Sequence, residues 1–319
     1  MGERRQTFGQ GVVMTAVILD GRKLAEEIKG KIKKEVELFK KDGIEPCLST
    51  ILVSNDPASK IYVNIKHKNC EEVGIKSKNF QFPEDTKQEE LIKFIGKLNE
   101  DKSVHGILLQ LPLPKQIDEN KAISAISPEK DVDGLHPVNM GKLIRGESSI
   151  IPCTPFGIQQ LLIKNGYDPS GKHVVICGRS NIVGKPLAAL LIQKKYGANA
   201  TVTLCHTGTK NLSYFTKQAD ILVVAIGSPK TITANMVKEE AIVIDVGINK
   251  IPDPNTKSGY RLVGDVDFDT VKEKAGAITP VPGGVGPLTV VMLLYNTLLT
   301  ASLQTDHELS YDLKNLFEH

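Results

Sequence analysis

The 319-residue chain is predicted to be an α/β protein of two domains. Short runs of β-branched and aliphatic residues alternate with stretches of helical periodicity in both halves, and this alternation implies mostly parallel sheets. A chain of this length commonly forms about two domains. Its content of 40% apolar and 24% charged residues describes a globular protein with a core.

The first half begins with an amphipathic helix that opens at Asp20 and Gly21 and ends at Gly43. Its apolar residues recur at helical spacing: Leu24, Ile28, Ile32, Val36 and Phe39. Further elements follow as a buried strand at 47–54, a helix from Pro57 to about Val73, a helix headed by a capping box at Thr86–Glu89, and a strand within 105–114. We therefore expect a three-layer α/β arrangement here.

The second half is predicted to be Rossmann-like. A linker helix at 152–166 precedes four β-rich runs separated by helical stretches, at 172–178, 200–205, 220–227 and 241–248. An apolar helix from about Pro287 is expected to return to the first domain. We predict a first domain of 14–152 plus 287–319, a second domain of 153–286, and a disordered extension at 1–13.

Composition excludes several classes of protein. The net charge of +3 is too small to indicate nucleic-acid binding, and no run of 18 uninterrupted apolar residues indicates a membrane span. The five cysteines are scattered, with no CxxC pair, and the histidines show no metal-ligand spacing. The first thirteen residues lack the apolar stretch of a secretory signal. We expect a cytoplasmic protein without a metal.

The run PVPGGVGPLT at 280–289 is a candidate ligand loop. Gly283, Gly284 and Gly286 let the backbone approach a flat ligand, and Pro287 suits the first turn of the following helix. Backbone N–H groups at the start of that helix would add donors. An ordinary loop before a helix is the alternative.

A second candidate site is the run CGRSNIVGKP at 177–186, directly after a strand. The strict GxGxxG fingerprint is absent, but Gly178 can make the turn and Gly184 can allow close helix–strand packing. Arg179 and Ser180 add a cation and a hydroxyl where a phosphate would lie. A plain strand-to-helix turn is the alternative.

The expected coenzyme is NADP rather than NAD. NAD-binding folds commonly place an acidic residue at the end of the second strand to bind the ribose. The residues at 205–210 read CHTGTK and contain no acid. Arg179, Thr207 and Lys210 are therefore candidates for binding a 2′-phosphate.

Polar residues of the first half form a third candidate site. Tyr62 and Lys66 are four residues apart, on one helix face, beside an apolar stripe that can partly shield the lysine from water. Gln110 ends a strand where open α/β sheets bind ligands. A solvated surface pair and a loop glutamine are the alternatives. Asp131 and Asp133 lack a third ligand at convincing spacing, so an aspartate-built turn is favoured over a metal site.

Together these runs resemble the methylenetetrahydrofolate dehydrogenase/cyclohydrolase family. Six motifs occur in order: YVNIKHKNCEEVGI, GILLQLPLP, PEKDVDGLHPVNMG, GRSNIVGKP, DVGIN and PVPGGVGPLT. The match begins near Met14. Leu288 stands where the family commonly has Met and Asn64 replaces a frequent Arg, but neither touches an expected catalytic position.

The resemblance implies a folate-binding domain, an NADP-binding domain and a homodimer. Methylenetetrahydrofolate would be oxidised to the methenyl cation and then hydrolysed to formyltetrahydrofolate. Lys66 would be the acid–base group, Tyr62 would stack on the folate, Gln110 would hold Lys66 and Asp133 would bind the pterin. The folate pocket would include Leu109, Leu111, Pro282, Gly283 and Gly284, and the dinucleotide would contact Gly178, Arg179, Ser180, Thr207 and Ile248.

Two other classes of function fit parts of the pattern. A shikimate or amino-acid dehydrogenase also combines a lysine and an aspartate with a Rossmann unit, but the Tyr62–Lys66 helix and the 280–289 run do not fit it. A non-catalytic dinucleotide-binding regulator would bind NADP without turnover. Formation of the methenyl product would separate these possibilities.

Overall fold

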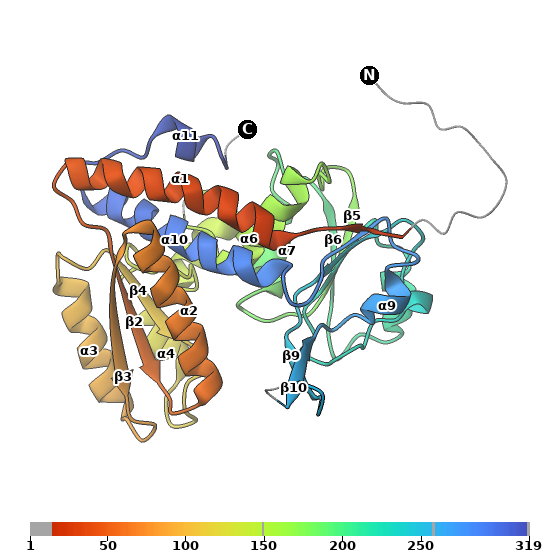
Figure 1. The fold of residues 1–319 in the computed structure, drawn as a ribbon, viewed down its shortest axis with the longest axis horizontal. Helices are drawn as coiled ribbons and strands as arrows, with labels where there is room; N and C mark the ends of the chain where they lie inside the picture. The colour runs from red at the N-terminus through yellow and green to blue at the C-terminus, as the bar shows by residue number, and fades with distance from the viewer. Residues whose placement is uncertain (1–14, 149, 257–258, 318–319) are drawn as a thin grey trace.

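A computed structural model describes residues 15–148, 150–256 and 259–317. The chain forms two α/β units side by side, which confirms the predicted fold class (Figure 1). The predicted extension at 1–13 lies outside the described residues.

The first unit is built on a parallel sheet in the order β3-β2-β4 (Lys76–Phe82, Cys47–Val53, Gly106–Gln110). Alternate side chains of β4 enter different layers, as the two-residue period of a strand requires. Ile107 and Leu109 pack beneath α3 (Gln88–Glu100), whereas Leu108 packs with α1 (Gly21–Lys41). Two more helices, α2 (Pro57–Val73) and α4 (Glu119–Ser124), complete this unit.

Helix starts in this unit depend on local capping. The Asp20 side chain accepts hydrogen bonds from the backbone N–H groups of Arg22 and Lys23, which fixes the start of α1. The predicted capping box at Thr86–Glu89 is wrong. The N-cap of α3 is Lys87, which makes no side-chain cap bond. Thr86 lies one residue before the cap, and its hydroxyl donates to the Pro83 carbonyl at 2.6 Å instead of capping the helix.

The second unit contains a six-stranded parallel sheet, two strands more than predicted. Its order is β1-β11-β8-β7-β5-β6 (Val17–Ile18, Ala277–Ile278, Ile242–Asp245, Ile221–Val224, His173–Cys177, Thr201–Cys205). The two extra strands, β1 and β11, have two residues each and are too short to show a periodic pattern. Because β1 pairs with β11, the start of the described chain contributes to this sheet.

The remaining elements of the second unit lie between and after these strands. An antiparallel hairpin, β9 and β10 (Asn249–Pro252 and Tyr260–Val263), projects beside the first unit (Figure 1). The short helices are α7 (Gly184–Leu191), α8 (Leu212–Thr216), η1 (Ala234–Met236) and α9 (Phe268–Val271). The connection between the units contains α5 (Pro137–Arg145) and α6 (Cys153–Lys164).

Helix α10 (Val285–Gln304) returns to the first unit as predicted. It packs against α1 and α6, and α11 (Tyr311–Lys314) follows it onto α1. Within the described residues, α10 is the one helix long and apolar enough to cross a membrane, but 61% of its apolar window is buried inside the protein. Its apolar composition is therefore explained by its place in the core.

Candidate active site

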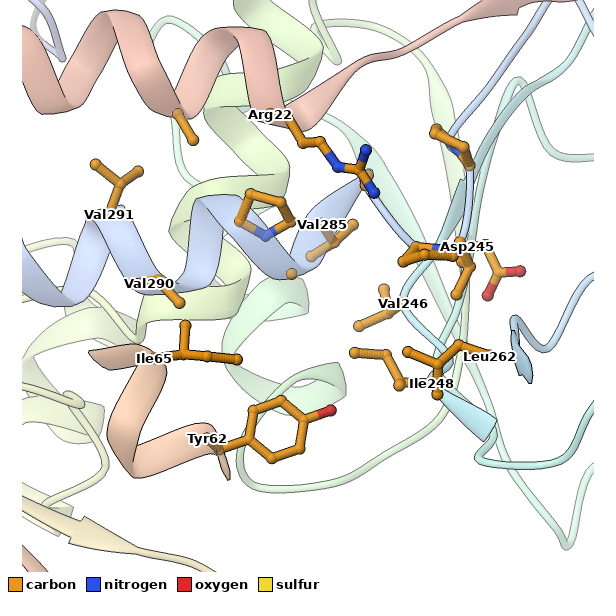
Figure 2. A pocket seen from close by; sticks show the side chains of 18 of the residues that line it. Arg22, Tyr62, Ile65, Asp245, Val246, Ile248, Leu262, Val285, Val290 and Val291 are labelled. Atoms are coloured by element: carbon orange, nitrogen blue, oxygen red, sulfur yellow. The ribbon is translucent and has the colours of Figure 1, made fainter. Parts of the chain in front are cut away.

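A pocket of about 620 Å³ lies where α1, α2 and α10 meet the segments that follow β8 (Figure 2). Its lining includes five residues predicted from the sequence: Tyr62, Ile248, Pro282, Gly283 and Gly284. The other walls are mostly apolar. This volume is in the range of pockets that hold a small organic ligand.

The glycines of the 280–289 loop are required by close backbone approaches. Gly283 has a φ of +116°, and its carbonyl accepts a hydrogen bond from the Gly21 N–H at 3.0 Å. A Cβ on Gly284 would lie 2.8 Å from the Pro280 carbonyl oxygen. The loop therefore holds the start of α10 against the start of α1, and its glycines are required for that contact. It is not an ordinary loop before a helix.

Lys66 and Gln110 meet at the carboxyl end of β4. The Lys66 Nζ donates to the Gln110 Oε1 at 2.9 Å, and the Gln110 Nε2 donates to the Leu111 carbonyl at 2.8 Å. Both side chains are half-buried, so Lys66 is not part of a solvated surface pair. One helix thus presents the Tyr62 ring to the pocket and the Lys66 amine to the sheet edge.

The two leucines beside Gln110 have different surroundings. Leu109 is buried in the cluster beneath α3, on the sheet face opposite Leu108. Leu111 is half-buried, and its carbonyl accepts the bond from Gln110. The Leu109 side chain is therefore buried in the core and does not line the pocket.

Asp131 stabilises a turn, in agreement with the aspartate-built turn predicted from the sequence. Its carboxylate accepts hydrogen bonds from the backbone N–H of His136 at 2.8 Å and from the Asn139 amide at 2.9 Å. Burial raises the pKa of Asp131. Across the described part of the chain, no three His, Cys, Asp or Glu side chains are grouped to hold a metal ion.

A buried cysteine connects Asp133 with Lys66 electrostatically. Burial raises the pKa of Cys153 well above its usual range, and the Asp133 charge raises it further, while the Lys66 charge lowers it. The charges of Lys66 and Asp133 therefore both act on Cys153, at the start of α6, with opposite effects on its pKa. The sequence analysis did not assign Cys153 to the site.

Asn296 is a second residue that the sequence analysis missed. It is fully buried on α10, and its Nδ2 donates to the carbonyls of Val132 at 2.8 Å and Ile151 at 2.9 Å. Val132 directly precedes Asp133, so this amide ties the aspartate loop to α10. An amide within the apolar run VVMLLYNTLL was the available signal.

Four of the five predicted coenzyme residues follow the carboxyl ends of β5 and β6: Gly178, Arg179, Ser180 and Thr207. Gly178 has a φ of +135°, and a Cβ there would lie 2.2 Å from the Ala225 carbonyl oxygen. A Cβ on Gly184 would lie 1.9 Å from the Gly178 carbonyl oxygen. Beside this turn, Arg179 and Ser180 are exposed. The turn is therefore a tight, glycine-dependent cradle with polar side chains at its rim, which fits a phosphate-bearing ligand.

Thr207 and Ile248 are placed differently from each other. The Gly178 N–H donates to the Cys205 carbonyl at 2.9 Å, which brings the exposed Thr207 near the glycine turn. Ile248 follows β8 and lines the pocket with 46% of its surface exposed. Among the predicted coenzyme residues, Ile248 thus lines this pocket, whereas Gly178, Arg179, Ser180 and Thr207 do not.

Two buried aspartates hold the segments after β7 and β8, and the segment after β8 lines the pocket. Asp245 accepts hydrogen bonds from the N–H groups of Gly247, Asp265 and Val266 at 2.9–3.0 Å. Asp265 accepts from those of Ile226 and Gly227 at 2.6 and 2.8 Å. Burial raises the pKa of Asp245 to about 6, although these amides oppose the shift.

Comparison with known proteins assigns this arrangement to a family. The family model "Tetrahydrofolate dehydrogenase/cyclohydrolase, catalytic domain" matches residues 19–133, and that of the NAD(P)-binding domain matches residues 152–305. The bifunctional protein FolD of Chloroherpeton thalassium is 54% identical over 285 residues, which cover 88% of this chain and 97% of the relative. The chain belongs to the tetrahydrofolate dehydrogenase/cyclohydrolase family.

Solved structures of the same family superimpose closely on this fold. The bifunctional FolD of Campylobacter jejuni has a TM-score of 0.86 at 48% identity and covers 91% of this chain and 100% of its own. The Trypanosoma brucei dehydrogenase-cyclohydrolase, solved with NADP and an inhibitor, also has a TM-score of 0.86, at 41% identity, with coverage of 92% and 100%. The Saccharomyces cerevisiae enzyme, described as NAD-dependent, is 25% identical with a TM-score of 0.74, and covers 91% and 98%.

Membership of the tetrahydrofolate dehydrogenase/cyclohydrolase family confirms the predicted pair of activities, oxidation and hydrolysis of a one-carbon folate. It also decides against a shikimate or amino-acid dehydrogenase and against a regulator without turnover. The second unit is an NAD(P)-binding domain.

Proposed function

We propose that both folate reactions of this enzyme take place around Lys66, with NADP as the coenzyme of the oxidative step. The observation that carries the proposal is the Lys66–Gln110 hydrogen bond of 2.9 Å at the carboxyl end of β4, one helical turn from Tyr62. Methylenetetrahydrofolate would place its pterin beside Lys66, Gln110 and Asp133, with Tyr62 stacking on its next ring.

The oxidative step needs positioning rather than a protein nucleophile. The coenzyme, when bound, accepts a hydride from the methylene carbon, which leaves the methenyl cation. The residues of the first unit hold the folate while the glycine cradle at 178–184 holds the dinucleotide. Pro282, Gly283 and Gly284 line the same pocket as Tyr62, so this loop would contact the bound folate.

Lys66 has a defined task in the hydrolytic step. Water attacks the methenyl carbon and Lys66 Nζ takes the proton released. That proton then goes to the ring nitrogen whose bond to carbon breaks, while the remaining hydroxyl proton passes to solvent as the formyl carbonyl forms. A cationic substrate disfavours a protonated lysine beside it, which promotes the basic form. The Gln110 Oε1 accepts from Nζ and so directs the amine, while Asp133 binds the pterin.

We propose NADP as the coenzyme because no acidic residue follows β6 to bind the ribose of NAD. Residues 205–210 supply Thr207 and Lys210, both exposed, and Arg179 is exposed on the neighbouring turn. A cation and hydroxyl donors suit a 2′-phosphate, whereas NAD would lack the acidic partner for its ribose. Initial rates with NADP and NAD in parallel test this, and a preference for NAD would contradict it.

We further propose the domain boundaries stated from the sequence, except that β1 joins the sheet of the second unit, together with a cytoplasmic location and a homodimer. The boundaries are supported by α10, which packs on the first unit although it follows the second in the chain. The resemblance to the family supports the dimer and the location. Sedimentation of the purified protein at assay concentration tests the dimer, and a monomer that is fully active would contradict it.

The role of Lys66 is tested by Lys66→Met. This change keeps the length of the side chain and removes the amine, so cyclohydrolase activity should be lost while part of the dehydrogenase activity remains. Absorbance of the methenyl product reports both steps. Lys68→Met, at an exposed position of the same helix, is the matched control. Equal loss of the two activities would show that Lys66 only binds the substrate.

A further inference from the structure

A second cavity, of about 640 Å³, lies between α6, α10 and α11, apart from the pocket in Figure 2. None of the described residues that line it also lines that pocket. Four of them lie on one face of α6, and most of the others come from α10, from the loop after α7, and from α11 and the residues beside it. The volume suits a small organic ligand.

Three aromatic rings form an apolar wall of this cavity. The ring centres of Tyr295 and Phe317 lie 4.3 Å apart, and that of Phe156 lies 5.0 Å from Phe317 and 5.8 Å from Tyr295. Ile163 and Leu299 extend the wall with aliphatic side chains. Because aromatic groups gain from edge-to-face and offset contacts with other rings, this wall favours a ligand that contains an aromatic ring.

The segments around the cavity are held by hydrogen bonds that do not depend on a ligand. The Gln159 Nε2 donates to the Gly197 carbonyl at 2.8 Å, which fixes the 195–197 loop against α6. At the start of α11, the Ser310 N–H donates to the buried Glu35 carboxylate of α1 at 2.8 Å. The cavity is therefore formed before a ligand binds, which lowers the cost of ordering on binding.

Gln160 is a buried polar side chain of this cavity that lacks a partner. Only 2% of its surface is exposed, yet its amide forms no hydrogen bond within the described part of the chain. The neighbouring Gln159 shows the usual arrangement, with its amide bonded to a carbonyl. Buried amides are ordinarily hydrogen-bonded, because an unmade bond leaves the cost of desolvation uncompensated. A polar group on a bound ligand would supply the missing partner.

Lys195 gives the cavity a positive charge. It is the one charged side chain among the described residues that line the cavity, and it forms no ion pair within the described chain. Desolvation lowers the pKa of the Lys195 ammonium, and no carboxylate opposes that shift. An anionic group on a ligand would therefore meet an unpaired cation beside an apolar wall, where a charge-assisted hydrogen bond is strong.

We propose that this cavity binds a small aromatic acid, a ligand with one or two rings and one carboxylate. Its ring packs against Phe156, Tyr295 and Phe317. The carboxylate accepts a hydrogen bond from the Lys195 Nζ, and a polar ring atom pairs with the Gln160 amide. An acid is selected over a neutral aromatic compound, since no acidic side chain is among the described residues that line the cavity. The site is separate from those of folate and coenzyme, so this proposal does not rest on the proposed function.

Indole-3-acetate is the probe, because it carries a carboxylate and a ring N–H on a two-ring body. Titration calorimetry in the presence of saturating NADP should give a Kd of about 0.1 mM for the wild type, as expected for a ligand of this size. Indole-3-acetamide, which has the same shape without the charge, should bind about tenfold more weakly. The 1-methyl derivative of indole-3-acetate, which lacks the N–H donor, should also bind more weakly.

Two variants assign the contacts. Lys195→Met should weaken binding of indole-3-acetate about tenfold and leave that of indole-3-acetamide unchanged. Gln160→Leu removes the amide, so indole-3-acetate and its 1-methyl derivative should then bind equally well. Lys194→Met, at an exposed position that does not line the cavity, is the matched control and should bind like the wild type.

The proposal is overturned if the wild type binds no indole-3-acetate, or binds the acid and the amide equally well. Competition of indole-3-acetate with methylenetetrahydrofolate or NADP in initial-rate assays would also overturn it, because the ligand would then lie in the active site. An unchanged Kd in Lys195→Met would place the carboxylate outside this cavity and would count against the proposal in the same way. Failure of the proposed function would leave these binding measurements unaffected.

Discussion

The two ligand-facing regions of this protein hold their polar groups in different ways. In the first unit, Lys66 and Gln110 are joined by one side-chain hydrogen bond and are only half-buried. In the second, Asp245 and Asp265 are fully buried and are surrounded by backbone N–H donors. The first arrangement holds an amine by one polar contact, whereas the second holds the loops after β7 and β8 by several backbone donors. The residues proposed to react are thus the less constrained ones.

The largest effect is expected from Gly184→Ala in the coenzyme cradle. The new Cβ would lie 1.9 Å from the Gly178 carbonyl oxygen, so α7 and the glycine turn must separate. Overpacking of this kind costs about 3 kcal/mol, which corresponds to about a 100-fold loss of coenzyme affinity if the cost falls on the bound state. Titration of NADPH fluorescence measures the loss.

Gly30→Ala is the matched control, because a Cβ at this helical position meets nothing within 4 Å. It should leave coenzyme binding unchanged. Circular dichroism verifies that both variants are folded. If Gly184→Ala bound NADPH as well as the wild type, the interpretation of the 178–184 turn as a tight, glycine-dependent cradle for the coenzyme would fail.

Asp245 should make stability depend on pH. Its pKa is raised from 3.8 to about 6 by burial, so the folded protein holds the proton more tightly than the unfolded chain. The contribution to stability is full below about pH 4 and is lost as pH rises to about 6, in total about 3 kcal/mol. The free energy of unfolding from urea titrations at pH 4, 5, 6 and 7 measures it.

The Asp245→Asn variant provides the reference for that experiment. Because the amide does not titrate, the stability difference between wild type and variant should shift by about 3 kcal/mol in favour of the variant between pH 4 and pH 7. Parallel curves would show that the buried carboxyl titrates as in the unfolded chain. The backbone N–H groups that bind Asp245 would then offset the cost of burying its charge more completely than we infer.

A smaller effect is expected at the aspartate loop of the first unit. Asn296→Leu keeps the side-chain shape but leaves the Ile151 carbonyl without its amide donor and the Val132 carbonyl with only the Cys153 thiol, at a cost of about 2 kcal/mol. Because Val132 precedes Asp133, cyclohydrolase activity should fall several-fold, as loss of one positioning contact commonly does. Thermal unfolding and the two activities are measured together.

Thr297→Val is the control on the same turn of α10. Its hydroxyl bonds only within its own helix, to the Leu293 carbonyl at 2.8 Å, so the loop should not respond. An Asn296→Leu enzyme that is destabilised but equally active would restrict Asn296 to a structural role. Loss of activity in both variants would point to a general effect of altering α10.

The two α/β units, the return of the last long helix and the local motifs could be predicted from the sequence. Periodicity and glycine positions are properties of short segments, so 172–178 and 280–289 could be interpreted without knowing their neighbours. The Thr86 capping box failed on the same scale, because the preceding turn competed for the hydroxyl. Two-residue strands such as β1 carry no pattern at all.

Which distant residues share a site became clear only from how the helices and sheets pack. The hydrogen bond from Lys66 to Gln110 joins residues 44 positions apart, and the one from Asn296 to Val132 joins residues 164 positions apart. The same packing also placed Leu109 in the core and left Arg22 without an ion-pair partner in the described chain, beside Gly283. Such contacts follow from how sheets and helices pack, since the length of chain between two residues does not limit their approach once the fold has formed.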